Sequence, residues 1–234
     1  MKAFLPNLLT LLNLLSGCIA VIYALQNELS VAAWFVFLGI FFDFFDGFLA
    51  RKLKVESALG LQLDSLADMV TSGLVPGLVM YQLMHEALNE TWNFENLLPY
   101  FGLLITVASA YRLAHFNISK THNNHFKGLP TPANAFLILS LPLILNHPSQ
   151  IIYAKFILNP WFLFGLTLLS AFLLNAPLKL MTLKFKSLHF SDNIEKFIFL
   201  VLSFVVLCFF KYVGILLSIF FYISISLIRP PKDV

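Results

Sequence analysis

An all-α, polytopic membrane protein is the fold class that this sequence predicts, and three observations support it. Of the 234 residues, 59% are hydrophobic and 12% are charged, and the mean hydropathy is +0.83. Soluble domains carry about 25% charged residues. The apolar residues also fall in runs about as long as a helix that crosses a bilayer. The net charge of +3 is too small to favour nucleic acid as a partner.

Eight apolar runs predict eight membrane-spanning helices, since a bilayer core of about 30 Å needs roughly 20 apolar residues per helix. The first run precedes no small-residue cleavage site, so we expect a retained span and not a signal peptide. The fifth is short and contains Pro142, and only Lys211 and its neighbours separate the last two, which predicts a hairpin. The predicted spans are 8–26, 30–51, 60–84, 98–117, 130–146, 157–175, 194–209 and 212–228.

Basic residues predict the orientation of these spans. If the eight helices alternate, the loops on one side carry most of the lysines and arginines, whereas the other side carries Glu28, Glu86, Glu90 and Glu95. Basic loops stay in the cytoplasm, so we expect both termini there, in a cell or inner membrane. The basic positions are Lys2, Arg51, Lys52, Lys54, the loop from Arg112 to Lys127, Lys179, Lys184, Lys186, Arg229 and Lys232.

Four aspartates lie in the second and third predicted spans. Asp43 and Asp46 are three residues apart and Asp64 and Asp68 are four apart, so each pair shares one helix face. An ionised carboxylate inside a bilayer is unfavourable and indicates a functional site. Two such faces opposed would surround a divalent cation with carboxylate oxygens. We therefore predict a metal site near the cytoplasmic ends of these spans.

The residues around the aspartates favour a phosphate ligand. Gly47, Ala50 and Gly60 are small enough for a bulky ligand to approach the backbone, and Arg51 offers a forked cation to a phosphate. Asp68, one turn beyond the other acids, could accept a proton from a nucleophile. The alternative is a path for cations or protons, which intramembrane acids also line.

The complete pattern resembles the signature of the CDP-alcohol phosphotransferase family. It reads D-x-x-D-G-x-x-A-R, eight residues, then G-x-x-x-D-x-x-x-D, and all of its fixed positions are filled between Asp43 and Asp68. The resemblance implies a membrane enzyme that transfers a phosphatidyl-type group from a CDP-linked lipid to an alcohol and releases CMP. It also implies a six-helix core within about 1–175, commonly in a homodimer, so that 190–230 would be an additional hairpin of the same membrane domain.

The resemblance further implies roles for the residues of the signature. Two divalent ions, Mg²⁺ or Mn²⁺, would lie between the second and third spans. Asp68 would serve both as a metal ligand and as the catalytic base. The other implied ligands are Asp43, Asp46 and Asp64, and the residues implied to line the CDP-lipid site are Gly47, Ala50, Arg51 and Gly60.

Motifs outside the signature resemble the branch of the family that uses CDP-diacylglycerol and L-serine. They are L-P-N-L-L-T-L-L-N at 5–13, D-S-L-A-D at 64–68, R-L-A-H-F-N at 112–117 and G-L-P-T-P-A at 128–133. The branch usually shows R-L-A-R-F-N, so His115 departs from it. Glycerol 3-phosphate and an inositol phosphate remain alternative acceptors.

The acceptor and the nucleotide need further contacts, for which the sequence offers several candidates. Thr10 and Asn13 could bind the cytidine of the CDP-lipid or cap the first helix. Serine carries a carboxylate, which Arg112 could bind at the cytoplasmic mouth, although Arg112 could equally anchor the helix at the membrane surface. The other candidates for the serine site are His115, Asn117 and Lys127.

Overall fold

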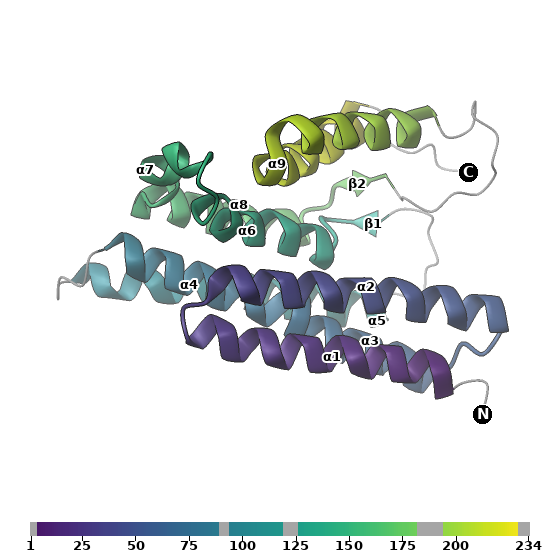
Figure 1. Cartoon of the computed structure of the whole chain (residues 1–234). Helices are drawn as coiled ribbons and strands as arrows, with labels where there is room; N and C mark the ends of the chain where they lie inside the picture. The colour runs from purple at the N-terminus through teal and green to yellow at the C-terminus, as the bar shows by residue number, and fades with distance from the viewer. Residues whose placement is uncertain (1–3, 89–93, 119–125, 182–193, 229–234) are drawn as a thin grey trace.

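The computed structural model describes residues 4–88, 94–118, 126–181 and 194–228, which form a helical bundle with one short β-ribbon (Figure 1). The helices run back and forth, so that α1 begins and α9 ends at the same end of the bundle (Figure 1). The elements are α1 (Phe4–Leu25), α2 (Leu29–Leu53), α3 (Ala58–Asp68), the π-helix η1 (Met69–Leu74), α4 (Val75–Ala87), the 3₁₀-helix η2 (Phe94–Leu103), α5 (Leu104–Ile118), β1 (Phe126–Lys127), α6 (Thr131–Leu145), the 3₁₀ turn η3 (Ile151–Tyr153), α7 (Ala154–Ile157), α8 (Pro160–Asn175), β2 (Lys179–Leu180) and α9 (Ile194–Ile228).

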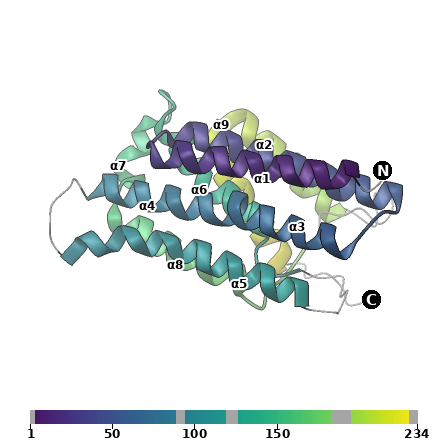
Figure 2. The same cartoon turned by 90° about the horizontal axis from the view of Figure 1, so that it is seen from below.

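Every predicted span coincides with a helical segment. The third is the continuous run of α3, η1 and α4, which Figure 2 shows in one line, and the fourth combines η2 and α5. α6 and α8 are apolar but have only 15 and 16 residues. The described residues include five segments long and apolar enough to cross a membrane: Phe4–Leu25, Leu29–Leu53, Ala58–Ala87, Leu97–Ile118 and Lys196–Ile228. The prediction of an all-α integral membrane protein is confirmed.

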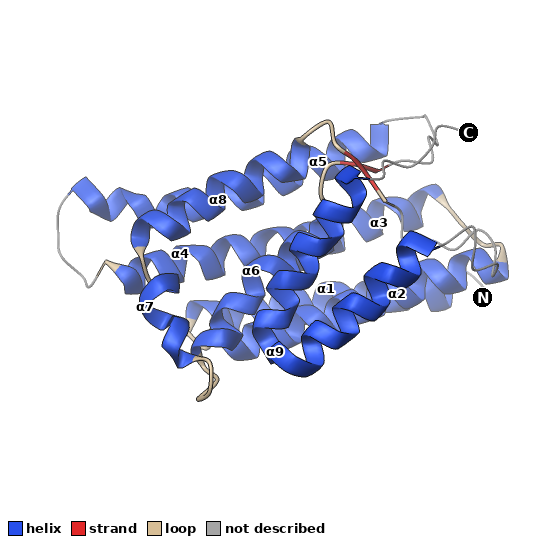
Figure 3. Ribbon diagram, turned by 90° about the horizontal axis from the view of Figure 1, so that it is seen from above, coloured by secondary structure: helices blue, strands red, loops and turns tan. Residues whose placement is uncertain are grey.

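α9 is a hairpin of two helical arms. Its regular backbone is interrupted at Lys211, which has φ 50° and ψ −122°. The arms touch beside this point, because a Cβ atom added to Gly214 would lie 2.7 Å from the carbonyl oxygen of Val206. Figure 3 shows the two arms folded back over α6 and α2. The predicted break near Lys211 is therefore where the chain reverses.

Three helical segments meet without intervening side chains at Thr71 of η1. A Cβ atom on Gly17 of α1 would lie 2.4 Å from Thr71 Oγ1 and 3.1 Å from its Cα, and one on Gly39 of α2 would lie 2.7 Å from Thr71 Cγ2. The Thr71 hydroxyl donates to the carbonyl oxygen of Asn13 over 3.2 Å. Small residues allow helices to approach closely where no hydrophobic effect drives them together. These close contacts of Gly17 and Gly39 with Thr71 fix the position of α3 and η1 along the axes of α1 and α2.

Gly17→Ala should destabilise the protein, because the added methyl group must displace the Thr71 backbone and not merely a side-chain tip. Overpacking of this kind costs about 1–3 kcal/mol. The measurement is thermal unfolding of the purified protein in detergent. Gly165→Ala is the matched control, since a Cβ atom there meets nothing within 4 Å. Equal unfolding temperatures for the two variants would contradict the tight packing at Thr71.

A second, smaller apolar cluster joins the β-ribbon to α9. Its buried members are Leu129, Leu180, Met181, Phe199 and Tyr222, beside the main core that runs through the helices. β1 and β2 pair antiparallel, with Phe126 opposite Leu180. Gly128 continues the ribbon with φ +76°, a conformation that glycine adopts without strain, and its N–H donates to the Leu178 carbonyl over 3.0 Å. The ribbon therefore links the start of α6 to the end of α8 beneath the hairpin.

Candidate functional site: an intramembrane carboxylate cluster

A tight turn places the two aspartate-bearing helices opposite each other. α2 ends at Leu53, and the left-handed backbone of its capping residue Lys54 (φ 53°) lets the Lys54 N–H reach the carbonyls of the last turn. α3 begins at Ala58, and the hydroxyl of its capping residue Ser57 accepts from the Gly60 N–H over 3.0 Å. The end of α2 and the start of α3 consequently lie at the same end of the bundle as the start of α1 (Figure 2).

Three carboxylates converge between these helices. Asp43 and Asp46 of α2 and Asp64 of α3 each offer an oxygen, and these oxygens all lie within 4.8 Å of one another. Asp46 is 6% exposed, and the other two are half-buried. Asp46 precedes the last residue of α2 by seven positions, or about 10 Å of helix. The cluster therefore lies inside the bundle and not on its end surface.

The cluster fits a divalent cation. Three carboxylates this close repel one another when ionised, and burial weakens their hydration. Hard divalent cations such as Mg²⁺ and Mn²⁺ prefer oxygen ligands of this kind. Three of the four predicted donors, Asp43, Asp46 and Asp64, are thus brought together by the fold.

Asp68, the fourth aspartate, is buried one turn deeper in α3. Its Oδ1 accepts from Asn13 Nδ2 over 3.4 Å, and Thr10 Oγ1 donates to Asp46 Oδ2 over 2.5 Å. Both contacts come from α1, so α1 orients the acids of the other two helices. The sequence suggested Thr10 and Asn13 for cytidine binding or helix capping but did not reveal these contacts. Cytidine binding by these residues stays a prediction.

Thr10→Val should weaken metal binding, because it removes the hydroxyl that holds Asp46 while keeping the side-chain volume. Losing such a partner of a metal ligand typically costs about 10- to 100-fold in metal affinity or activity. The measurement is the Mn²⁺ concentration that gives half-maximal stabilisation of the protein against thermal unfolding. Thr10→Ser keeps the hydroxyl and serves as the control. An unchanged Mn²⁺ dependence in Thr10→Val would show that Asp46 needs no such partner.

A π-helix follows Asp68 directly. η1 covers Met69–Leu74, and Pro76 lies two residues beyond it in the first turn of α4. Proline has no N–H to donate to the carbonyl four residues earlier, here that of Ser72, and its ring clashes with a regular turn. The wider turn of the π-helix accommodates the missing hydrogen bond and the proline ring. Single π-helical turns of this kind frequently occur at functional sites. Ser72, Gly73 and Pro76 are visible in the sequence, but the spacing alone did not indicate a π-helix.

The small residues and the arginine of the signature lie between the aspartates and the end of the bundle. A Cβ atom on Gly47 would lie 3.5 Å from Arg51 Nη1, so the exposed guanidinium folds back over Gly47. Ala50 is half-buried in the same part of α2. A Cβ atom on Gly60 would approach Asn7 Oδ1 of α1 to 3.4 Å. These residues surround the approach to the carboxylates from the bundle end.

Arg112 of α5 is buried beside the aspartates. Its exposed fraction is 9%, its guanidinium is close enough to Asp68 to interact electrostatically, and its Nε has no hydrogen-bond partner in the described part of the chain. This placement favours a role in the site over one as a surface anchor. A buried, unpartnered guanidinium nitrogen is unfavourable unless a ligand pairs with it.

The other candidate acceptor residues lie elsewhere on α5 and β1. Asn117 Oδ1 accepts from Ser65 Oγ over 3.0 Å, which ties the end of α5 to α3. His115 is exposed, with its ring 6.3 Å from that of Tyr111. Lys127 lies in β1 opposite Lys179. Of the four candidates, Arg112 is thus the one that lies within electrostatic range of Asp68.

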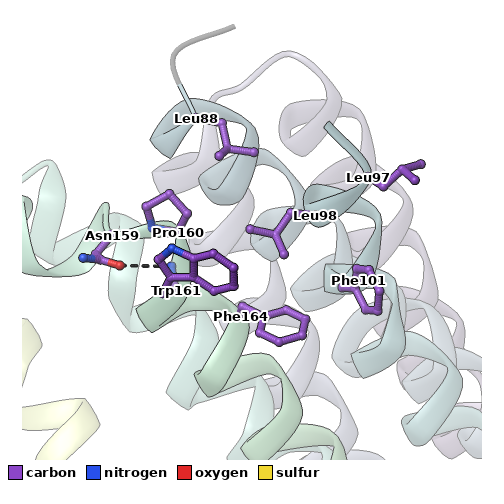
Figure 4. A pocket seen from close by; sticks show the side chains of 8 residues that line it. All are labelled: Leu88, Leu97, Leu98, Phe101, Asn159, Pro160, Trp161 and Phe164. Carbon is purple, nitrogen blue, oxygen red and sulfur yellow. Dashed lines mark hydrogen bonds between the residues drawn. The ribbon is translucent and has the colours of Figure 1, made fainter. Parts of the chain in front are cut away.

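A cavity of about 510 Å³ lies at the other end of the bundle, where α4 ends and α8 begins (Figure 4). Asn159 caps α8 there by accepting from the Trp161 N–H over 3.0 Å. The cavity is lined by Leu88, Leu97, Leu98, Phe101, Asn159, Pro160, Trp161 and Phe164. It contains none of the residues predicted for the site.

Helices long and apolar enough to span a membrane enclose a cluster of carboxylates. This protein is therefore a polytopic membrane protein with a candidate divalent-metal centre. Residues 3–173 match the sequence profile of CDP-alcohol phosphatidyltransferase. The chain belongs to the CDP-alcohol phosphatidyltransferase family. The predicted resemblance to this family is confirmed.

Relatives within the family share about a third of their residues with this chain. The CDP-diacylglycerol–serine O-phosphatidyltransferase of Bacillus subtilis is 32% identical over 147 residues, which cover 61% of this chain and 77% of that protein. The protein of the same name from Helicobacter pylori strain J99 is 33% identical over 143 residues, covering 60% and 58%. The archaetidylserine synthase of Methanothermobacter thermautotrophicus is 31% identical over 141 residues, covering 59% and 58%. Each match thus leaves part of the chain and part of the relative unaligned.

Proposed function

We propose that this protein transfers a phosphatidyl group from CDP-diacylglycerol to L-serine, giving phosphatidylserine and CMP. The observation that carries the proposal is the convergence of Asp43, Asp46 and Asp64, with Arg112 buried within electrostatic range of Asp68. The names of the relatives from Bacillus subtilis and Helicobacter pylori support the choice of donor and acceptor.

The aspartates would hold two divalent ions, Mg²⁺ or Mn²⁺. Asp43, Asp46 and Asp64 would hold them, with Asp68 as a further ligand. Bound there, the ions would neutralise the diphosphate of the donor and stabilise the charge that develops on departing CMP. The Thr10 hydroxyl, which donates to Asp46 Oδ2 over 2.5 Å, would orient this carboxylate for metal binding.

The donor would enter from the lipid, with its nucleotide at the end of the bundle where α2 ends. Gly47, Ala50 and Gly60 leave room for the diphosphate beside the backbone, and the exposed Arg51 can form forked hydrogen bonds to a phosphate. Large apolar side chains on the outer face of α2, including Phe44 and Phe48, are exposed and suited to acyl chains.

Asp68 would act as the base. Its carboxylate accepts the proton of the serine hydroxyl, and the hydroxyl oxygen forms a bond to the β-phosphorus, which carries the diacylglycerol. The bond from this phosphorus to the bridging oxygen breaks, and that oxygen leaves with CMP. The contact of Asn13 Nδ2 with Asp68 Oδ1 at 3.4 Å restricts the rotation of the carboxylate.

Arg112 would bind the carboxylate of serine. Its guanidinium lies within electrostatic range of Asp68, so a serine held there by its carboxylate places its hydroxyl near the proposed base. A neutral alcohol would not need a buried cation at this place. This is the feature of the site that favours an acceptor with an acidic group.

The test is the release of CMP by the purified protein with Mn²⁺, CDP-diacylglycerol and one acceptor at a time. We expect CMP with L-serine, and little with glycerol 3-phosphate or an inositol phosphate. CMP release with one of those acceptors instead would reassign the acceptor. No CMP with any acceptor, together with ion flux into protein-containing vesicles, would favour a cation or proton transporter.

The orientation and assembly belong to the same proposal. We expect both termini and the carboxylate cluster at the cytoplasmic face of a cell or inner membrane, and a homodimer. A protease that cuts near both termini only in inverted vesicles would support the orientation. Cross-linking of labelled protein in the membrane tests the dimer. A labelled dimer band that becomes weaker when excess unlabelled protein is added would support it.

A further inference from the structure

α5 packs antiparallel along α3 and η1, and two hydrogen bonds fix its position along them. Near the start of α5, the Thr106 hydroxyl donates to the Gly73 carbonyl over 3.2 Å. At its end, Asn117 Oδ1 accepts from Ser65 Oγ over 3.0 Å. The residues of α5 between these two points therefore lie beside the stretch of α3 and η1 that carries Asp68.

The buried face of this part of α5 carries two polar side chains. Ser109 is 0% exposed and Arg112 is 9% exposed, and they are three residues apart, so they are neighbours on the same helix face. A Cβ atom added to Gly73 would lie 3.1 Å from Ser109 Cβ, so η1 approaches Ser109 closely. At 1.5 Å per residue, Arg112 lies about 4.5 Å farther along α5, in the direction of Asp68.

Both side chains have a hydrogen-bonding atom without a partner in the described part of the chain. These atoms are Ser109 Oγ and Arg112 Nε. Ser109 differs in this from Ser140 and Thr167, two buried residues whose hydroxyls donate to carbonyls of their own helices over 2.7 and 2.8 Å. Buried polar groups left unpaired are unfavourable. Two of them on neighbouring positions indicate a ligand that pairs with both.

A carboxylate is the chemical group that fits this pair. The Arg112 nitrogen can only donate, and the Ser109 hydroxyl can donate as well. An ionised carboxylate is an acceptor with two oxygens, so it can receive one hydrogen bond from each residue. An ammonium group can only donate and therefore cannot pair with the guanidinium.

We propose that Ser109 is a specificity-determining residue whose hydroxyl donates to one oxygen of the acceptor's carboxylate while Arg112 Nε donates to the other. This inference rests on the proposed function. It places the carboxylate of L-serine deeper in the bundle than Asp68, with the reacting hydroxyl directed back toward Asp68 and the metal site. Ser109 has no part in binding metal or the lipid donor.

Ser109→Ala tests this inference, because it removes the hydroxyl and leaves the Cβ atom beside Gly73. We expect the KM for L-serine to rise about 10- to 100-fold, the range for a lost hydrogen bond to a charged group. The kcat and the KM for CDP-diacylglycerol should change little. Ser140→Ala is the matched control, since Ser140 is equally buried but its hydroxyl bonds within α6. A wild-type KM for L-serine in Ser109→Ala would overturn the inference.

Thermal unfolding without acceptor separates ligand binding from a structural role. Ser109→Ala should unfold at the wild-type temperature or above it, because its hydroxyl has no partner to lose among the described residues. A clearly lower unfolding temperature would show that the hydroxyl stabilises the free protein, which would contradict the inference.

Competition by L-alanine identifies the group that Ser109 binds, because L-alanine has the carboxylate of L-serine but no hydroxyl. If Ser109 binds the carboxylate, Ser109→Ala should raise the Ki of L-alanine by the same factor as the KM of L-serine. An unchanged Ki, or no competition in the wild type, would count against a site for the carboxylate. Wild-type protein that releases no CMP with L-serine would instead refute the proposed function itself.

Discussion

Asp68→Asn should abolish turnover while the protein still binds CDP-diacylglycerol. The amide keeps the shape of the buried carboxylate and can still accept from Asn13 Nδ2, but it cannot take the proton of the acceptor hydroxyl. Loss of a general base typically lowers the rate about 10²- to 10⁴-fold. CMP release measures the rate, and stabilisation by CDP-diacylglycerol against thermal unfolding measures donor binding.

The control for this variant is Glu86→Gln, the same change at an exposed acid near the end of α4. It should turn over at the wild-type rate. If Asp68→Asn keeps wild-type turnover, Asp68 is not the base. If it loses donor binding together with turnover, the role of Asp68 as a metal ligand dominates over its role as a base.

Asp43→Ala should remove the response of the protein to divalent metal. One of three carboxylates whose oxygens lie within 4.8 Å of one another is lost, so the ion loses a charged ligand. Without metal, the variant should be no less stable than the wild type, because the repulsion within the cluster is relieved. With Mn²⁺, only the wild type should gain stability, since a ligand that binds the folded state raises its unfolding temperature.

Thermal unfolding with and without Mn²⁺ measures both effects and does not depend on activity. Glu28→Ala, at the exposed turn between α1 and α2, is the control and should respond to Mn²⁺ as the wild type does. A normal Mn²⁺ response in Asp43→Ala would mean that Asp43 is not a ligand. Activity should fall in parallel with the lost metal response.

The membrane spans and the pairing of the aspartates on two helix faces could be predicted from the sequence, because both depend on local patterns. Apolar runs set the helices, and helical spacing places Asp43 with Asp46 and Asp64 with Asp68. Long-range packing was not predictable in this way. The contact of Thr10 with Asp46 joins residues 36 positions apart. Pairing of β1 with β2 joins segments about 50 residues apart that carry no strand signal of their own.

The site residues that belong to the motif from Asp43 to Asp68 were predictable from the sequence. The burial of Arg112 depends on how α5 packs in the bundle, which no spacing rule describes. The π-helix after Asp68 depends on how the chain accommodates Pro76. The division into a six-helix catalytic core and an added hairpin stays a prediction.

The short helices α6 and α8 have a consequence for the membrane around the protein. At 1.5 Å per residue, 15 and 16 residues span about 22 and 24 Å, less than the hydrocarbon core of about 30 Å. At the ribbon end of both helices, the Leu129 N–H donates to the Leu173 carbonyl over 2.8 Å and keeps the irregular backbone there satisfied. α6 is buried among other helices, whereas α8 exposes Trp161, Leu168 and Phe172, so the lipids beside α8 must adapt to the hydrophobic mismatch. Beside α8 we therefore expect the bilayer to be locally thinner than elsewhere around the protein.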